Sequence, residues 1–370
     1  MKILFVNLPY LGHVIPTVGL VQELVKAGHQ VTYLLPFDWE DRLADSGAEF
    51  LGYENSPKLD RQIRSAFFKA ESVIAGYDLL IYEQFFFVGK HLAEKHCKKC
   101  VRIFTAPATN HQLMRDFLSH GGPMGIFRIP LISPLWTMDT VKGLGISLTC
   151  RSWLDEIVEN PPHCNLVYTL PEFQPYAEQF PEEKFHFIGP SVYDRQEEAF
   201  PQLPKPVICI SLGTIVKGAK GFFRTCIDAF REEAVTVVLS VGDRFDIAGL
   251  GEVPENVIVR SRIPQVEVLK QSSLFITHGG MNSVSEAMIL GVPMVVIPFV
   301  SDQPVNAAQV EKLGLGKTLE YKTVTETVLR ETAFSVLADE SILDRVRNMK
   351  KRITEAPGNP GAVRIIEERT

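Results

Sequence analysis

The stretch Leu274-Phe275-Ile276-Thr277-His278-Gly279-Gly280-Met281-Asn282-Ser283 decides how this chain is interpreted. An apolar run with the length of a buried strand comes first, two glycines follow, and residues 282–290 have the composition of a helix. A strand, a glycine turn and a helix N-terminus form an anion site, because several backbone N–H groups are unpaired there and the helix dipole favours negative charge. The stretch therefore predicts a strand–turn–helix unit with a phosphate-binding loop.

Two further polar groups follow this loop. Glu286 lies one turn into the expected helix, and the pair Asp302-Gln303 follows the next apolar run. Glu286 is too far along the helix to reach a phosphate, but it is placed to accept hydrogen bonds from sugar hydroxyls. This order of groups suits a nucleotide-sugar.

Size, charge and hydropathy bound the class of protein. The chain has 370 residues, of which 45% are hydrophobic, and a formal net charge of -6. That length favours two domains. The charge and the lack of a dense Lys/Arg run argue against a nucleic-acid binder. No run of about 18 apolar residues is present, so neither a transmembrane helix nor stable membrane insertion is expected.

The N-terminus and the cysteines favour a cytoplasmic protein. The segment MKILFVNLPYLGH is interpreted as a first strand, because it has a single lysine and no small-residue cleavage site. The six cysteines are scattered, which suits a reducing compartment. Cys97 and Cys100 form one C-x-x-C pair without a second pair, so structural thiols are favoured over metal or redox use. No metal site is therefore expected.

The first half of the chain alternates strand and helix signals. Pro16 is expected to start a helix, whose apolar face follows at 3.6-residue spacing and which Gly28 ends. Such β–α alternation implies a parallel sheet covered on both faces. The strands expected in this half are 2–8, 31–35, 78–82, 101–105 and 166–170.

A proline-rich, charged segment at 191–206 is interpreted as a linker. It separates a domain at 1–190 from a second alternation at 207–340, which the C-terminal helices at 341–370 follow. Two doubly wound domains facing each other across a cleft are the expected α/β architecture. The second half is expected to contain strands at 207–211, 235–241, 257–259, 274–277 and 294–297, and helices at 221–231, 282–290, 304–312, 325–337, 341–354 and 362–368.

Residues 110–150 interrupt this regularity. Gly and Pro occur there at irregular spacing among large apolar residues, which fits neither a clean helix nor a strand. A mobile flap over an apolar pocket and an irregular loop packed on the core are the two interpretations.

Ligands bind beyond the carboxyl ends of strands in open parallel sheets. In the first half, His13 lies in the loop after the first expected strand, Glu83 directly follows another, and Thr105 to Asn110 follow the next. In the second half, Ser211–Thr214, His278 and residues 298–303 follow strands. These groups are therefore the candidates for a shared site.

His13 has a plain chemical reason to act as a base. A histidine with a pKa near 6.5 accepts a proton at neutral pH, and a carboxylate such as Glu83 would orient the ring and stabilise its charged form. The alternative is that His13 only caps the following helix.

These residues resemble the motifs of the family 1 glycosyltransferases, which have the GT-B fold. The resemblance covers nearly the whole chain and rests on motifs that occur in order at plausible spacing. The motifs are Gly12-His13-x-x-Pro16, Ser211-Leu212-Gly213-Thr214, Pro264-Gln265-x-x-x-Leu269, His278-Gly279-Gly280-x-Asn282-Ser283-x-x-Glu286 and Asp302-Gln303.

The resemblance implies a metal-independent, inverting transfer of a hexose, with UDP-glucose as the favoured donor and no cofactor. It also implies that the C-terminal helix returns to the N-terminal domain. His13 would deprotonate the acceptor hydroxyl, with Glu83 as its partner. The implied donor-binding set is Gly12, Ser211, Gly213, Thr214, Arg262, Ile263, Gln265, His278, Gly280, Asn282, Ser283, Glu286, Asp302 and Gln303.

Two positions depart from the family pattern. Glu83 stands where the family commonly has Asp, so the pair with His13 is either shifted by about an ångström or not formed. Arg262 stands where many plant members have Trp, and its guanidinium either stacks on the base or points to solvent. The second departure leaves open a uridine or a thymidine donor.

The acceptor is the least defined partner. An aromatic run is more often core than pocket, but if it lines a pocket the acceptor is an apolar molecule such as a flavonoid, another phenol or a macrolide. The rival hypotheses are a glycolipid acceptor, a nucleotide-sugar 2-epimerase and a non-catalytic nucleotide-sugar binder, and the oligomeric state is left open. The candidate acceptor residues are Phe85, Phe86, Phe87, Phe117, Met124, Phe127, Leu135 and Trp136.

Overall fold

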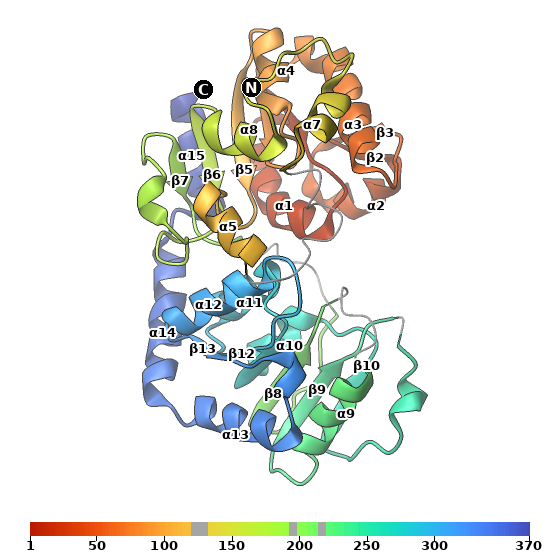
Figure 1. The fold of residues 1–370 in the computed structure, drawn as a ribbon, viewed down its shortest axis with the longest axis vertical. Coiled ribbons are helices and arrows are strands. Elements are labelled where there is room, and N and C mark those ends of the chain that lie inside the picture. The colour runs from red at the N-terminus through yellow and green to blue at the C-terminus, as the bar shows by residue number, and fades with distance from the viewer. Residues whose placement is uncertain (120–131, 192–197, 214–219, 244) are drawn as a thin grey trace. The chain divides into compact units, whose positions relative to one another are not determined.

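The structure, a computed structural model, describes residues 1–119, 132–191, 198–213, 220–243 and 245–370. The chain divides into two compact units (Figure 1). The first contains Met1–Asp116, the described part of Met124–Asp194, and Ala356–Thr370, and the second is built mainly on Arg195–Glu355. The division falls inside the segment 191–206.

The first unit contains a parallel sheet of seven strands in the order β3-β2-β1-β4-β5-β6-β7. Every neighbouring pair in it is parallel. Both faces are covered, since the central strands are almost wholly buried. The strands are β1 (Lys2–Val6), β2 (Gln30–Pro36), β3 (Glu49–Tyr53), β4 (Leu79–Glu83), β5 (Lys99–Phe104), β6 (Cys164–Val167) and β7 (Phe185–Phe187).

Helices connect and cover these strands. The helices of the first unit are α1 (Leu11–Lys26), α2 (Glu40–Leu43), α3 (Leu59–Val73), α4 (Gly89–Lys95), most of α5 (His111–Ser119), α7 (Pro134–Val141), α8 (Trp153–Glu159) and α15 (Gly358–Arg369).

Helix α1 begins upstream of the predicted start at Pro16, so that prediction was wrong. The Tyr10 carbonyl accepts hydrogen bonds from the N–H groups of His13 and Val14 at 2.8 and 2.9 Å, which closes the first turn before the proline. Pro16 therefore lies inside the helix, where its missing N–H removes only the bond to the carbonyl four residues earlier. The helix ends as predicted, with Gly28 in the left-handed conformation at a φ of 88°.

The described part of 110–150 contains helices, contrary to the expectation that the segment fits neither a clean helix nor a strand. Asn110 begins α5, because its side-chain oxygen accepts the N–H of Leu113 at 2.7 Å. Ser133 caps α7 by accepting the N–H of Trp136, and Pro134 occupies the first helical position. Both capping signals are present in the sequence. Residues 120–131, in the middle of the segment 110–150 for which a flap was one interpretation, lie outside the described residues.

The second unit repeats the architecture with a parallel sheet of six strands, ordered β10-β9-β8-β11-β12-β13. Its strands are β8 (Val207–Ser211), β9 (Thr236–Ser240), β10 (Val257–Arg260), β11 (Leu274–Thr277), β12 (Met294–Val296) and β13 (Gly316–Thr318). Its helices are α9 (Lys220–Ala229), α10 (Gln265–Gln271), α11 (Met281–Leu290), α12 (Gln303–Lys312), α13 (Glu326–Leu337) and α14 (Glu340–Glu355).

The strands that the sequence did not predict all lie at sheet edges. These are β3, β7 and β13, with three to five residues each. An edge strand is half exposed and short, so its apolar run is too weak to read from composition.

The two C-terminal helices belong to different units. Helix α14 packs on α11 in the second unit, whereas α15 packs on α1 and β6 in the first. Figure 1 shows α15, in blue, beside β6. Ala362, Val363 and Ile366 of α15 are part of the core that includes Val14, Val18 and Val21 of α1. The last helix thus returns to the N-terminal unit.

The strand orders place a topological switch point in each unit. In the first sheet, the strands that follow β1 in the chain lie on both sides of it, so β1 is between β2 and β4. In the second sheet, β8 is likewise between β9 and β11. In such sheets the loops beyond the two central strands form the ligand site. His13 and Glu83 come from one switch point, and Ser211 and His278 from the other. Within the described part of the chain, no helix has the combined length and apolar character needed to cross a bilayer.

Candidate active site

In the first unit, the structure brings His13 and Glu83 together. His13 lies in the first turn of α1 rather than in the predicted loop, and Glu83 is the last residue of β4. Nδ1 of His13 is 2.8 Å from Oε1 of Glu83. The Glu83 side chain is fully buried, while that of His13 is 21% exposed. The longer glutamate side chain therefore still reaches the imidazole.

The partners of the two side chains fix the tautomer of His13. An ionised carboxylate only accepts hydrogen bonds, so the proton of a neutral imidazole must sit on Nδ1. Oε2 of Glu83 accepts the backbone N–H of Phe85 at 2.9 Å, which holds the carboxylate in place. Nε2 is then left with the lone pair. The side chain of His13 bonds to Glu83 and Thr105, so the helix-capping alternative does not describe it.

Three supporting residues surround this pair; Thr105 was expected from its place after a strand, whereas Asn7 and Tyr33 were not singled out from the sequence. The Thr105 hydroxyl, directly after β5, lies 3.2 Å from Nδ1 of His13. Nδ2 of the fully buried Asn7 donates to the backbone carbonyl of His13 at 3.0 Å and to the Tyr33 hydroxyl at 3.2 Å. These bonds anchor both the ring and the backbone of His13. Asn7 directly follows β1 and Thr105 directly follows β5, so strand-end position is the signal for these two, whereas Tyr33 lies inside β2 and has no such signal.

Aromatic side chains surround the His13 ring. Its centroid is 4.2 Å from that of Phe85 and 6.0 Å from that of Tyr10. Phe85 in turn packs edge-on against Trp153, and Trp136 stacks on Trp153 at 5.7 Å. Burial, and then the charge of Glu83, raise the pKa of Tyr10 to about 12, so this phenol stays protonated at neutral pH. Tyr10 therefore offers an apolar ring rather than a second base.

The other aromatic candidates have mixed positions. Phe86 is fully buried and packs near Tyr82, so it belongs to the core and does not line an open pocket. Phe87 is also buried, against Trp153, whereas Leu135 is 76% exposed. Phe117 is partly buried, and Met124 and Phe127 lie outside the described residues.

In the second unit, His278 follows β11 and lies against two glycines. A Cβ atom on Gly213 would be 2.7 Å from Cε1 of His278, and one on Gly280 would be 2.6 Å from Nε2. Both positions therefore require glycine for the ring to fit, and Gly213 also has a φ of 67°. Thr214, the next predicted donor-binding residue, lies outside the described residues.

His278 is held in its neutral form. Burial lowers the pKa of its imidazole to about 4, although a hydrogen bond to the Ser211 backbone acts in the opposite direction. The side chain is only 6% exposed. At neutral pH the ring therefore carries no positive charge, and its single N–H donates to the Ser211 backbone.

Helix α11 places polar groups one turn apart on one side. Gly280 is the N-cap residue, and Asn282 and Ser283 belong to the first turn. Nε2 of Gln265, at the start of α10, donates to Oε2 of Glu286 at 2.5 Å and to the Ser283 hydroxyl at 3.4 Å. The structure thus joins Gln265 to Ser283 and Glu286, which the sequence placed in a different motif.

Asn306 links the glycine turn to Asp302. Its Nδ2 donates to the Gly279 carbonyl and to Oδ2 of Asp302, each at 2.9 Å, and the residue is 1% exposed. The sequence analysis did not single out Asn306. Its spacing of four residues from Asp302 on one helix face is the signal that could have done so.

Gln303, predicted to contact the donor, also holds the loop before α12 through backbone hydrogen bonds. Its Oε1 accepts the backbone N–H groups of Phe299 and Val300 at 2.8 and 3.0 Å, and the residue is 1% exposed. Only the Nε2 group of its amide has no hydrogen bond among the described residues. Ser301 nearby has a φ of 64°, an uncommon conformation for serine.

Three further donor-site candidates are at or near the surface. Arg262 is 80% exposed and pairs with Asp243, which agrees with the interpretation that it points to solvent. Ile263 is partly buried, and Gly12 is exposed in the first turn of α1.

Comparison with known proteins identifies the family. A sequence profile described as "UDP-glucoronosyl and UDP-glucosyl transferase" matches residues 194–360. The NDP-glycosyltransferase YjiC of Bacillus licheniformis is 35% identical, and the match spans 98% of this chain and 96% of that protein. The chain belongs to this glycosyltransferase family. The resemblance drawn from the motifs is thus confirmed, and the protein is a glycosyltransferase.

Other relatives extend the comparison. The oleandomycin glycosyltransferase of Streptomyces antibioticus is 28% identical over 96% of this chain and 88% of its own. Among solved structures, the glycosyltransferase of kitacinnamycin superposes with a TM-score of 0.86, at 27% identity over 99% of this chain and 98% of that one. The calicheamicin glycosyltransferase CalG4 gives 0.82 at 29% identity, over 99% and 97%. These structures confirm the GT-B fold.

Proposed function

We propose that this glycosyltransferase moves glucose from UDP-glucose to a hydroxyl group of an apolar small molecule, with inversion at the anomeric carbon. A macrolide, a flavonoid or another phenol is the proposed acceptor class. The observation that carries the proposal is the His13–Glu83 pair, in which a buried carboxylate holds Nδ1–H and leaves Nε2 of a partly exposed imidazole as a base.

The proposed chemical step is a single displacement. The acceptor hydroxyl gives its proton to Nε2 of His13 while its oxygen forms a bond to the anomeric carbon. The bond from that carbon to the diphosphate oxygen breaks, and the diphosphate leaves with the electron pair. Glu83 stabilises the imidazolium formed at His13.

The second unit supplies groups for the donor in this proposal. The N-terminus of α11 presents backbone N–H groups to the diphosphate, whose charge grows as it leaves. Ser211, Gly213, Thr214, Asn282 and Ser283 are the further proposed contacts of the diphosphate. The neutral His278 ring lies among them and is proposed to hold the Ser211 backbone in place through its single N–H. Since these donors stabilise the leaving group, the transfer step itself needs no metal ion.

The sugar and nucleoside portions have their own proposed contacts. Glu286, oriented by Gln265, bonds the ribose hydroxyls, and Gln265 and the Ile263 backbone meet the base. Asp302 and Nε2 of Gln303 bond hydroxyls of the transferred sugar. Asn306 acts through Asp302 as a positioning residue, because it fixes that carboxylate relative to the Gly279 turn.

The acceptor class follows from the surroundings of His13. Tyr10, Phe85 and Trp136 are partly buried aromatic residues in the group that surrounds the base, which suits a large apolar molecule. The relationship to an oleandomycin glycosyltransferase supports a macrolide within that class.

A mass-spectrometric screen tests the proposal. The purified protein is incubated with UDP-glucose, TDP-glucose or UDP-N-acetylglucosamine, each with a panel of macrolides and flavonoids. A hexose adduct formed with UDP-glucose, with a β linkage by NMR, is the expected result. Epimerised sugar in the absence of acceptor, or calorimetric UDP binding without any adduct, would overturn it in favour of an epimerase or a non-catalytic binder.

A further inference from the structure

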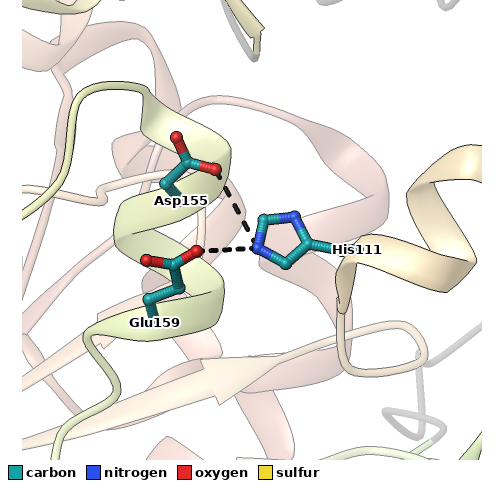
Figure 2. A group of neighbouring side chains, drawn as sticks. All are labelled: His111, Asp155 and Glu159. Atoms are coloured by element: carbon teal, nitrogen blue, oxygen red, sulfur yellow. Dashed lines mark hydrogen bonds and ion pairs between the residues drawn. The ribbon is translucent and has the colours of Figure 1, made fainter.

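A cluster of metal-ligand side chains lies in the first unit, outside the residues assigned to sugar transfer. Figure 2 shows His111, from the start of α5, directed toward Asp155 and Glu159 on α8. Nε2 of His111 is 3.0 Å from Oε1 of Glu159 and 3.9 Å from Oδ1 of Asp155. One ligand atom from each side chain lies within 4.8 Å of the other two.

These separations fit one ion at ordinary bond lengths. Zinc binds imidazole nitrogen and carboxylate oxygen at about 2.1 Å, so two ligand atoms in a tetrahedral site are about 3.4 Å apart. The two measured separations from His111 lie on either side of that value by about half an ångström. Small side-chain rotations therefore suffice to close three ligands around an ion.

The charge of the cluster also favours a cation. Among the described residues, neither Asp155 nor Glu159 forms an ion pair with a lysine or an arginine, and both pair only with His111. Two carboxylates thus face one imidazole, and a neutral imidazole leaves their charge uncompensated. A divalent ion would balance both charges and accept the lone pair of Nε2.

The ligands are held by neighbouring groups. The Ser152 hydroxyl donates to Oδ2 of Asp155 at 2.7 Å, which leaves Oδ1 for the ion. The Asn110 side chain begins α5 and so fixes the backbone next to His111. The Cys150 thiol lies 3.9 Å from Oε2 of Glu159 but is not one of the three ligands. Such outer hydrogen bonds orient metal ligands and raise their affinity.

We propose that His111, Asp155 and Glu159 form a binding site for a divalent first-row transition ion, with Zn²⁺ as the expected occupant. Imidazole nitrogen favours zinc over the hard cations Mg²⁺ and Ca²⁺, which prefer all-oxygen ligand sets. The ion would join the first turn of α5 to α8. Because the ligands take no part in the transfer step, this site is separate from the metal-independent chemistry proposed above.

Calorimetric titration of the full-length, chelator-treated protein with Zn²⁺ tests the proposal. All proteins carry Cys97→Ser, which removes the exposed thiol of the C-x-x-C pair as a competing ligand. One zinc ion per chain is expected. His111→Ala should lower the affinity for zinc about 10²-fold or more, because the loss of a hydrogen-bond partner of a metal ligand alone lowers the affinity by up to about 10²-fold. Glu159→Gln, which keeps the side-chain shape, should also weaken binding, and Mg²⁺ should not compete.

Two variants serve as matched controls. His163→Ala removes another exposed histidine, and Cys150→Ser removes the nearby thiol but leaves the three ligands; both should bind zinc within a few-fold of the parent. Zinc should raise the melting temperature of the parent and of both controls but not that of His111→Ala. Unchanged affinity in both His111→Ala and Glu159→Gln, or loss of binding only in Cys150→Ser, would overturn the proposal.

Discussion

His13 and His278 each lie at the switch point of one unit's sheet, His13 after β1 and His278 after β11, but they have opposite surroundings. Each lies beyond a central strand at the switch point of a parallel sheet. His13 is partly exposed and bonded to the buried carboxylate of Glu83, whereas His278 is 6% exposed and bonded to the Ser211 backbone. The fold thus provides two similar positions, and the neighbours of each ring decide its chemistry.

The difference separates a base from a hydrogen-bond donor. A carboxylate stabilises the imidazolium that forms when His13 takes a proton, so His13 suits proton transfer. Burial disfavours the imidazolium of His278, so that ring suits a permanent neutral role. Substitutions at the two positions should therefore have effects of different kinds.

The largest effect is expected from His13→Ala. Removal of the base should lower kcat for glucose transfer about 10³-fold, within the range for general-base catalysis, while the KM for UDP-glucose changes little. UDP release in the presence of acceptor measures both quantities, and His163→Ala is the control for loss of an exposed histidine. Activity within a few-fold of the parent would remove His13 from the proton-transfer role.

The next effect is expected from Glu83→Gln. A glutamine can donate a hydrogen bond to Nδ1, which permits the other tautomer, and it provides no charge for the imidazolium. The kcat should fall about 10²-fold. Glu83→Asp keeps the charge and should recover part of the loss. An unchanged rate in Glu83→Gln would show that the carboxylate only holds the loop through the Phe85 N–H group.

A smaller effect is expected from Asn306→Ala in the second unit. Loss of the bridge between Gly279 and Asp302 should lower kcat/KM for UDP-glucose about tenfold, with a weaker preference for glucose over N-acetylglucosamine. Asn306→Asp places two carboxylates together and should be worse than Asn306→Ala. A change in stability without any change in sugar preference would show that the bridge serves only the fold.

The smallest effect concerns the pH dependence of stability. The folded-state pKa of His278 is about 4, below its ordinary value of 6.5, so the unfolded chain binds the extra proton first as the pH falls. Above pH 6.5, His278 should therefore leave the free energy of unfolding unchanged. It should lower the free energy of unfolding by about 2 kcal/mol at pH 5 and reach its full effect below pH 4. Denaturant unfolding at pH 7 and pH 5 should show about 2 kcal/mol less pH dependence in His278→Asn than in the parent. An equal pH dependence of the free energy of unfolding in the variant and the parent would contradict a neutral, buried His278 ring.

Much of the fold was predictable from sequence because buried parallel strands are continuous apolar runs. The runs at 207–211 and 274–277 became β8 and β11 with the predicted bounds. The start of α1 was misjudged because proline is common at a first helical position, whereas the Tyr10 carbonyl accepts the N–H groups of His13 and Val14 and begins the helix earlier. Tyr10 makes no side-chain capping bond, so no Ser, Thr, Asp or Asn marks this start in the sequence.

The candidate site was predictable by strand ends but not by side-chain direction. The juxtaposition of His13 and Glu83 follows from β1 and β4 being neighbours. Phe86 shares its residue type with Phe85 but turns into the core, because consecutive residues leave the chain in different directions. The roles of Thr105 and Asn306 as connectors appear only when the distances are known.

Nitrogen-15 NMR of the histidine rings tests the contrast between the two histidines most directly. The signals of His13 and His278 are assigned by their absence in His13→Ala and His278→Asn. In its neutral form, His13 should carry its proton on Nδ1 and have an unprotonated Nε2. His278 should stay neutral from pH 8 down to about pH 5. An unprotonated Nδ1 on neutral His13, or titration of His278 near pH 6.5, would contradict the assignment of His13 as the base and of His278 as a neutral hydrogen-bond donor.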